Sequence, residues 1–384
     1  MTPKHILFLL GIYPSYGGVE MVTTVLANRF IEDGHSVTIA SFSQPKNDFA
    51  ELHLSKKCHL LSLSYPVLSL KNMKKLRAYV RNRHVDVLIN QWVLPFTVTL
   101  VWKWALAGTG CKVYSVHHNK PDTNRCIQEL EIKINAGKNY LKVLRYWVRE
   151  ISRLSLAFCI RSSHKFIVLS TSFIPITEKY ARVAKDGKIL SITNPITIDV
   201  PAEEPPKEKE IIYVGRIEYN QKRTFRVIDI WKELESQFPD WKLTVVGDGE
   251  DRVDLERRIK EYGLERVCIT GFVNPIAYYQ RASILLLTSE YEGFGLVVVE
   301  AMKFGVVPVV YNSYESATDL ITDGYNGVLV EKPFDVHSFT KAVKVLMDKT
   351  EYWTELSNNG RISLEKFSVK KIVEEWYLLM GKSC

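Results

Sequence analysis

Short runs of Val, Ile and Leu recur along the chain and alternate with stretches of helical periodicity. Apolar runs of this length are typical of strands buried on both faces, and their alternation with helices indicates parallel sheets. The strands predicted in the first half are Ile6–Leu10, Val37–Ala40, Val85–Asn90, Val113–Val116, Phe166–Leu169 and Ile189–Ile192. Those predicted in the second half are Ile211–Val214, Leu243–Val246, Val267–Thr270, Ile284–Leu287, Val307–Val310 and Val328–Val330.

A segment rich in proline and charge, residues 201–209, separates these two series of strands. Its composition cannot build a hydrophobic core and is typical of an interdomain linker. We therefore predict two doubly wound, Rossmann-like α/β domains, residues 1–200 and 210–365, facing each other across a cleft. Ligands of such domains bind at the carboxyl ends of the strands, so the candidate residues are sought there.

Composition fits this picture and adds a charge asymmetry. Of the 384 residues, 46% are apolar and 24% charged, which excludes disorder, collagen and coiled coil. Residues 1–200 carry 27 Lys and Arg against 13 Asp and Glu, whereas the remainder carries 24 against 30. The first domain is therefore expected to face something anionic, such as a membrane surface. Nucleic acid is not expected as a partner, because no recognition motif is present.

Cysteines and apolar segments indicate the compartment. The six cysteines are scattered without a C-x-x-C pair, so we expect reduced thiols and no structural zinc site. The apolar run Ile6–Ile12 reads as a buried strand and not as a signal peptide. The longest apolar stretch, Trp92–Gly108, contains Pro95 and Lys103 and is short for a span of about 20 residues. A cytoplasmic protein without a transmembrane helix is expected.

A glycine turn follows the first predicted strand. Gly17 and Gly18 open a helix there, where paired glycines allow close approach of a ligand and the helix N-terminus offers N–H groups to an anion. Glycines are also common in such turns for steric reasons alone. The dinucleotide fingerprint G-x-G-x-x-G is absent from the chain, which disfavours a hydride-transfer enzyme.

A basic turn follows the first strand of the second domain. Arg216 and Lys222 lie in this turn, and an arginine fork with a lysine point charge suits a diphosphate. A solvated basic turn is the alternative interpretation. The chain contains no D-x-D triplet that could hold a metal against a diphosphate, so protein cations would have to offset its charge.

A pair of glutamates flanks a third turn, which follows the strand Ile284–Leu287. Glu292 and Glu300 are separated by seven residues, and a helix is predicted to begin near Leu296 after Gly295. Two carboxylates at this spacing could bind the hydroxyl groups at either end of an elongated ligand whose anionic middle meets the helix N-terminus. A nucleotide-sugar has this shape. The alternative is a capping Glu292 and a surface Glu300.

The stretch EGFGLVVVEAM closely resembles the nucleotide-sugar signature of the retaining family-4 glycosyltransferases, also called group 1. The segments YPSYGGVE, VGRIEYNQK, VVGDGE, ITGF and NGVLV agree with that family in order. The resemblance covers nearly the whole chain, and it implies the GT-B architecture of two Rossmann-like domains. It also implies that the closing segment, residues 366–384, forms a helix that packs back on the first domain.

The resemblance implies a role for each matching residue. Glu300 would bind the ribose hydroxyls of the donor nucleotide, and Glu292 would lie beside the donor sugar. Arg216 and Lys222 would neutralise the departing diphosphate, although an extra residue between them leaves Arg223 as the alternative to Lys222. The remaining donor-binding residues would be Gly17, Gly18, Gly293, Phe294, Gly295 and Leu296.

Two histidines, His117 and His118, end the fourth predicted strand. Relatives often carry a histidine before Asn or Asp at this strand end, facing the donor sugar, and His118 precedes Asn119. His118 is therefore the candidate, together with Glu292, Arg216 and Lys222, for the catalytic group. Retention without a nucleophile implies front-face attack, with catalysis by positioning and by stabilisation of the leaving diphosphate.

Together with these residues, the resemblance implies a retaining, metal-independent hexosyltransferase of bacterial surface-polysaccharide or lipopolysaccharide biosynthesis, with a nucleotide-sugar donor, UDP by family frequency, and no cofactor. Its acceptor would be a glycan or a lipid-linked glycan. Lys142, Arg145, Arg149 and Arg153 lie on one helical face that could contact the anionic inner face of the cytoplasmic membrane, or could simply be solvated. The alternatives are a nucleotide-sugar 2-epimerase of the same architecture and a non-catalytic nucleotide-sugar-binding protein.

Overall fold

The computed structural model describes residues 2–199 and 205–381, and its contacts divide the chain into two compact units. Unit 1 comprises the residues up to Thr197 together with those from Phe367 onwards, and unit 2 runs from Ile198 to Lys366. Residues 201–204 of the predicted linker lie outside the described residues.

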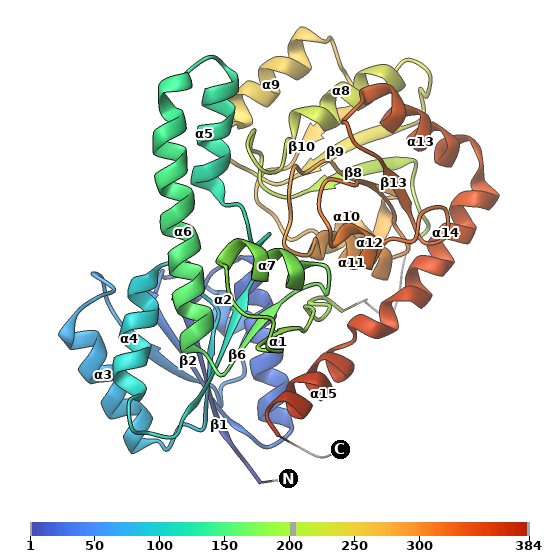
Figure 1. Ribbon diagram of the computed structural model, residues 1–384. Coiled ribbons are helices and arrows are strands. Elements are labelled where there is room, and N and C mark those ends of the chain that lie inside the picture. The colour runs from blue at the N-terminus through green and yellow to red at the C-terminus, as the bar shows by residue number, and fades with distance from the viewer. Residues whose placement is uncertain (1, 200–204, 382–384) are drawn as a thin grey trace. The chain divides into compact units, whose positions relative to one another are not determined.

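Unit 1 contains a seven-stranded parallel sheet of order β3-β2-β1-β4-β5-β6-β7 (Figure 1). Its strands are β1 (His5–Ile12), β2 (Ser36–Ser43), β3 (His59–Ser62), β4 (Val87–Asn90), β5 (Lys112–His117), β6 (Lys165–Val168) and β7 (Ile189–Ser191). Its helices are α1 (Gly18–Glu32), α2 (Phe49–His53), α3 (Leu70–Asn82), α4 (Phe96–Leu106), α5 (Arg125–Asn135), the 3-10 turn η1 (Asn139–Leu141), α6 (Lys142–Ser162), α7 (Phe173–Ala181) and α15 (Val369–Leu379).

The apolar strands of unit 1 are covered on both faces. Leu7 and Leu9 of β1 belong to a core that includes residues of α3, α4, α6 and α7. Phe8, which points to the opposite face because side chains alternate along a strand, stacks on Phe30 of α1 with ring centroids 6.2 Å apart. Burial on both faces explains why these strands read as continuous apolar runs.

The last helix, α15, packs within unit 1 against α1. The Tyr377 hydroxyl donates a hydrogen bond of 2.6 Å to Asp33, and its ring lies against Phe30 and His35. The Lys4 ammonium donates to the carbonyl oxygen of Met380 over 2.9 Å. Residues from the two ends of the chain therefore share one core.

Unit 2 contains a six-stranded parallel sheet of order β10-β9-β8-β11-β12-β13. Its strands are β8 (Glu210–Val214), β9 (Lys242–Val246), β10 (Val267–Ile269), β11 (Ile284–Leu287), β12 (Val307–Tyr311) and β13 (Val328–Val330). Its helices are α8 (Phe225–Leu234), α9 (Arg252–Glu261), α10 (Ile276–Arg281), α11 (Leu296–Lys303), α12 (Ala317–Leu320), α13 (Val336–Asp348), α14 (Thr350–Ile362) and the 3-10 turn η2 (Ser363–Phe367).

The predicted fold class of two doubly wound α/β domains is confirmed. Each predicted apolar run coincides with all or part of a strand in one of the two sheets. The edge strand β3 was missed. Of its four residues, Leu61 is the single buried one, and the other three are exposed. An edge strand with one buried side chain produces no apolar run, so the pattern gave no signal for it.

We expect Trp376→Ala to destabilise unit 1 by about 3–5 kcal/mol, because the buried indole leaves a cavity between α15 and the sheet. Leu378→Ala is the matched control on the same helix, since Leu378 is exposed. Hydrogen exchange of α1 and α15 in the full chain would measure both effects. Equal protection in the two variants would contradict the packing role of Trp376.

Candidate functional site

The two motif-bearing turns of unit 2 lie side by side at the point where the strand order reverses. Strands β8 and β11 are neighbours, and the chain leaves β8 towards β9 but leaves β11 towards β12, on the other side. The basic turn follows β8, and the turn that carries the two glutamates follows β11. A reversal of this kind leaves a crevice outside the carboxyl ends of the strands, where ligands of doubly wound sheets bind.

Hydrogen bonds join these two turns directly. The Lys222 ammonium lies 2.6 Å from Oε1 of Glu292. The Gln221 side chain donates to the carbonyl oxygen of Tyr291 over 3.2 Å, and the backbone carbonyl oxygen of Gln221 accepts from the backbone N–H of Glu290 at 2.7 Å. The sequence prediction did not single out Gln221, although the residue lies inside the VGRIEYNQK segment.

The Lys222–Glu292 ion pair is largely buried, with 15% of the lysine side chain and 9% of the glutamate side chain exposed. Each charge is costly to bury alone, so each stabilises the other in this place. The positive charge of Lys222 is therefore already balanced by the carboxylate of Glu292. The net positive charge of the turn depends mainly on its other cations, Arg216 and Arg223.

Arg216 is the exposed cation of the basic turn. Its side chain is 58% exposed, and its guanidinium lies 3.3 Å from a carboxylate oxygen of Glu218 and 3.3 Å from the amide oxygen of Gln221. These contacts hold the two terminal nitrogens of the guanidinium, Nη1 and Nη2, and the exposed group can still reach a ligand.

Arg223, the alternative to Lys222, is directed towards different partners. Its backbone has a φ of 51°, and its guanidinium lies 3.5 Å from Glu290 and over the ring of Tyr219 at 4.9 Å. Arg226 shares the same carboxylate of Glu290 at 2.8 Å. Lys222 and Arg223 are thus neighbours in sequence that pair with different glutamates.

The glycine turn before α11 requires its last glycine. Gly295 has a φ of +91° and caps the N-terminus of α11, and a Cβ built on it would lie 3.1 Å from the hydroxyl oxygen of Tyr314. The helix begins at Leu296, as predicted. The N–H of Val298 in its first turn donates to the carbonyl oxygen of Gly295 over 2.9 Å, and the N–H groups of Leu296 and Val297 before it have no acceptor within the helix.

Glu300 lies in the fifth position of α11 and accepts a hydrogen bond from a buried tyrosine. The hydroxyl of Tyr279, from α10, donates to Oε2 of Glu300 over 3.1 Å. Tyr279 is fully buried and stacks on Phe304 with ring centroids 5.8 Å apart. Burial, reinforced by the Glu300 carboxylate, raises the pKa of Tyr279 well above its usual value, so the hydroxyl stays a donor. Tyr279 gave no sequence signal beyond an apolar helix face.

In unit 1 the strand order reverses between β1 and β4, and two candidate turns lie near that point. Gly17 and Gly18 follow β1, where Gly17 caps the N-terminus of α1. His117 and His118 end β5, the strand beside β4. The structure therefore places the predicted residues of unit 1 at one edge of its sheet.

A glutamine that the sequence prediction missed holds His118. Nε2 of His118 is hydrogen-bonded to the amide oxygen of Gln91, which directly follows β4. Because that oxygen can only accept, Nε2 carries the proton and Nδ1 is left as the acceptor of the neutral ring. Burial, with a smaller contribution from His117, lowers the pKa of His118 to about 3, so the ring is neutral at physiological pH.

His117 lies deeper than His118 and stacks on Phe166 with ring centroids 6.3 Å apart. Burial lowers the pKa of His117 to about 4, an effect that the backbone of Lys120 partly offsets. His117 packs against the ring of Phe166 in β6, as a core side chain does. His118, in contrast, is held at the end of the strand by its hydrogen bond to Gln91.

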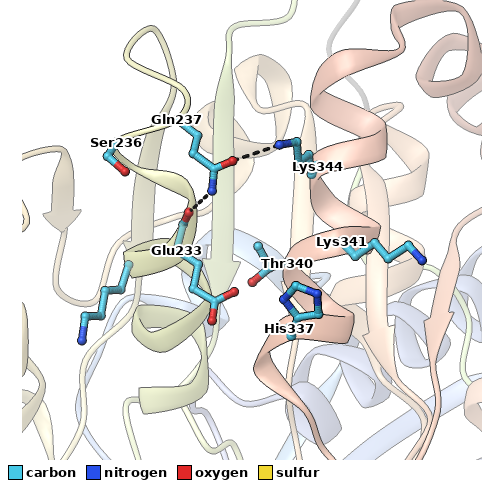
Figure 2. Close-up of a pocket in the computed structure, with 8 residues that line it drawn as sticks. Glu233, Ser236, Gln237, His337, Thr340, Lys341 and Lys344 are labelled. Carbon is cyan, nitrogen blue, oxygen red and sulfur yellow. Dashed lines mark hydrogen bonds between the residues drawn. The ribbon is translucent and has the colours of Figure 1, made fainter.

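A separate hollow of about 470 Å³ lies between α8 and α13 of unit 2. Figure 2 shows Glu233, His337 and Thr340 around it, with Gln237 bonded to Lys344 across one end. None of the residues predicted from the motifs lines this hollow. The candidate site is therefore the pair of turns after β8 and β11.

No helix within residues 2–199 and 205–381 is both long and apolar enough to span a bilayer. Over the same residues, no group of three or more His, Cys, Asp and Glu side chains is placed to hold a metal ion.

Two family models match the chain one after the other. Residues 16–200 match the model of Glycosyltransferase Family 4, and residues 196–363 match the model of Glycosyl transferases group 1. The chain belongs to the group 1 glycosyltransferases. The second match contains both turns described above, from Arg216 to Glu300.

Known proteins resemble this group 1 glycosyltransferase over almost its whole length. It is 28% identical to an uncharacterized glycosyltransferase of Haemophilus influenzae, covering 97% of this chain and 99% of that one. It is also 28% identical to a Campylobacter jejuni enzyme named as a diNAcBac-PP-undecaprenol-glycan α-1,4-N-acetyl-D-galactosaminyltransferase, covering 95% of each chain.

Solved structures share its fold. Staphylococcus aureus TarM, in complex with UDP among other ligands, has a TM-score of 0.77 at 13% identity, covering 99% of this chain and all of that one. Anabaena HepE, in complex with UDP and glucose, has a TM-score of 0.76 at 16% identity, covering 98% and 99%. At this identity the likeness concerns the fold, which is the GT-B arrangement of two Rossmann-like domains.

We expect Lys222→Met and Glu292→Gln each to lower the free energy of unfolding of unit 2 by about 3 kcal/mol, because each leaves a buried charge without its partner. The double variant should lose clearly less than the sum of the two. Chemical denaturation of the four proteins measures the coupling.

The exposed pair Lys209–Asp240 serves as the matched control for this cycle. Its coupling should stay below about 1 kcal/mol. Equal coupling in the buried and the exposed pair would contradict the stabilising role of the Lys222–Glu292 contact.

Proposed function

We propose that this glycosyltransferase moves a hexose from a nucleoside-diphosphate sugar, most simply a UDP-sugar, to a glycan or a lipid-linked glycan, with retention of the anomeric configuration and without a metal ion. The observation that carries the proposal is the junction of the two turns in unit 2. That junction combines cations, a helix N-terminus and two carboxylates beside one crevice. These are the groups that a diphosphate flanked by two hydroxylated sugars requires.

The proposal assigns the donor to these groups in order. The ribose hydroxyls are bound by Glu300, which Tyr279 holds in place. The diphosphate is bound by Arg216, by Lys222 and by the amide groups from Gly293 to Leu296. The hexose lies beside Glu292, whose Oε2, 3.5 Å from the amide nitrogen of Gln221, can also accept from a sugar hydroxyl.

The chemical step is derived from these groups. The bond between the anomeric carbon and the β-phosphate oxygen breaks, and the acceptor oxygen forms its bond to that carbon from the same face. The acceptor proton passes to the departing phosphate oxygen, so the products are the glycosylated acceptor and the nucleoside diphosphate. Negative charge grows on the diphosphate in the transition state, where Arg216 and the α11 N-terminus stabilise it.

His118 and the glycines of unit 1 complete the proposal. Since the pKa of His118 is lowered to about 3, its ring is a neutral hydrogen-bonding group that could orient a hydroxyl and would not act as a cation. Gly17 and Gly18 would allow the first loop to approach the donor.

Relatives support the substrate classes. The Campylobacter jejuni enzyme is named for a polyprenyl-diphosphate acceptor, and a Salmonella typhimurium relative, 28% identical over 54% of this chain, is named as a lipopolysaccharide 1,6-galactosyltransferase. Product analysis distinguishes the two alternatives, because a 2-epimerase would return an altered nucleotide-sugar and a binding protein would return the donor unchanged.

Calorimetric titration with UDP, GDP and ADP in EDTA should show that one nucleotide binds without a metal. Glu300→Ala should abolish this binding, and Tyr279→Phe should weaken it about tenfold, because the carboxylate loses its fixed donor. Tyr278→Phe, one residue earlier in α10, is the control and should bind normally. Metal-dependent binding, or full binding by Glu300→Ala, would refute the assignment.

Arg216→Ala should lower the turnover number by roughly 100-fold or more, because the variant loses charge stabilisation at the leaving diphosphate. Arg257→Ala, which removes an exposed guanidinium from α9, should leave turnover unchanged. Turnover is measured as nucleoside diphosphate release with acceptor present, and NMR of the product reports the anomeric configuration. Equal rates for the two variants would rule out this role of Arg216.

A further inference from the structure

Helices α5 and α6 of unit 1 pack against each other and form an arm, and α6 also packs on α4 and α7. All the buried residues of α6 lie between Ser155 and Ile160, and α5 has one buried residue, Ile127. Figure 1 shows the first half of α6 continuing past the sheet of its unit beside α5. This half of α6 has no core of its own unit to cover.

A row of large apolar side chains is nevertheless exposed on that half. We call it the α6 stripe, and it consists of Tyr140 in the 3-10 turn η1 before the helix and of Val143, Leu144, Tyr146, Trp147, Ile151 and Leu154 in α6. Each side chain is between 50% and 75% exposed. Most of them follow one another at intervals of three or four residues, so they lie on one face of the helix.

The stripe differs from ordinary surface residues in being contiguous. Soluble proteins expose single apolar residues without consequence, but a continuous patch marks a surface that contacts something else. Tyr146 and Trp147 are in edge contact, with ring centroids 5.7 Å apart, so aromatic side chains form its middle. An amphipathic helix normally turns such a face to its own core.

Three of the four residues on the basic face of α6, which the sequence pattern offered as a membrane contact or a solvated surface, have partners within unit 1, and the fourth, Lys142, is exposed. Arg145 lies 3.2 Å from Glu131, and Arg153 lies 2.8 Å from Glu150. The guanidinium of Arg149 lies over the ring of Tyr180 at 5.6 Å. The arginines of this face are thus partly occupied by contacts within the unit, whereas the side chains of the α6 stripe are exposed.

We propose that the α6 stripe inserts into the headgroup region of an anionic bilayer and so places unit 1 at the membrane surface. Trp and Tyr are the side chains that favour this depth, because their rings are apolar and their polar atoms remain hydrated. Lys138, which lies between α5 and η1, is exposed at the end of the arm, where it can meet lipid phosphates.

The net positive charge of unit 1 favours an anionic bilayer, rather than a second copy of the chain, as the partner of the stripe. Residues 1–200 carry 27 Lys and Arg against 13 Asp and Glu, so they attract an anionic surface. Two copies joined through the stripe would bring like charges together. The inference concerns unit 1 alone and does not depend on the donor assignment in unit 2.

Insertion of apolar side chains has a consequence that distinguishes it from attraction between charges. Burial of the stripe is not screened by salt, whereas binding through lysines and arginines is. Membrane binding should therefore persist at an ionic strength that removes a purely electrostatic contact.

The test is co-sedimentation of the full chain with vesicles of phosphatidylcholine and phosphatidylglycerol, at about 0.1 M and about 0.5 M NaCl. Wild type should sediment with the vesicles and keep at least half of its bound fraction at the higher salt. The variant Trp147→Glu/Ile151→Glu should lose binding by tenfold or more. Val253→Glu, at a residue of α9 that is 71% exposed, should bind as wild type does.

Three results would overturn the proposal. The first is that wild type does not sediment with the vesicles. The second is that wild type loses binding at high salt while the stripe variant still binds. The third is that light scattering shows a dimer of wild type and a monomer of the stripe variant. Nucleotide titration of the stripe variant without vesicles should match wild type. A defect there would concern the donor site or the folding of the variant, and a melting curve separates those two causes.

Discussion

The buried contact between Lys222 and Glu292 is the interaction on which the candidate site depends. It joins turns that follow two neighbouring strands, and each of its charges is stable in place because the other is present. The side-chain and backbone hydrogen bonds of Gln221 then align the two turns, and the amide oxygen of Gln221 also lies 3.3 Å from the guanidinium of Arg216. The pairing of Lys222 with Glu292 leaves Arg216 as the exposed cation of the turn, so the positive charge that a ligand can meet depends on these contacts as well as on the number of basic residues.

Each unit repeats one principle, in which a rigid parallel sheet supports polar side chains at its carboxyl edge. In unit 2 a buried tyrosine, Tyr279, fixes Glu300, and in unit 1 Gln91 fixes His118. In both cases a neutral side chain from a neighbouring element supports the motif residue. A buried hydroxyl or amide adds no charge, so it can orient a functional group at low desolvation cost.

The α6 arm departs from the rule that amphipathic helices turn their apolar face inward. Its second half packs on unit 1, while its first half presents aromatic and aliphatic side chains to solvent. The arginines that suggested an anionic contact satisfy carboxylates and a ring of the same unit. The apolar side chains on the exposed half of α6 therefore remain in contact with water after folding, and their burial against a further surface would be favourable.

The sequence by itself determined the α/β class, twelve of the strands and the turns that carry the candidate residues, because apolar periodicity and glycine turns are local properties of the chain. It missed β3, whose single buried side chain leaves no periodic signal. Only the tertiary structure decided that Lys222 pairs with Glu292, that Tyr279 bonds to Glu300 and which face of α6 stays exposed. These contacts join residues far apart in the chain, so they depend on strand order and helix packing, which local pattern does not specify.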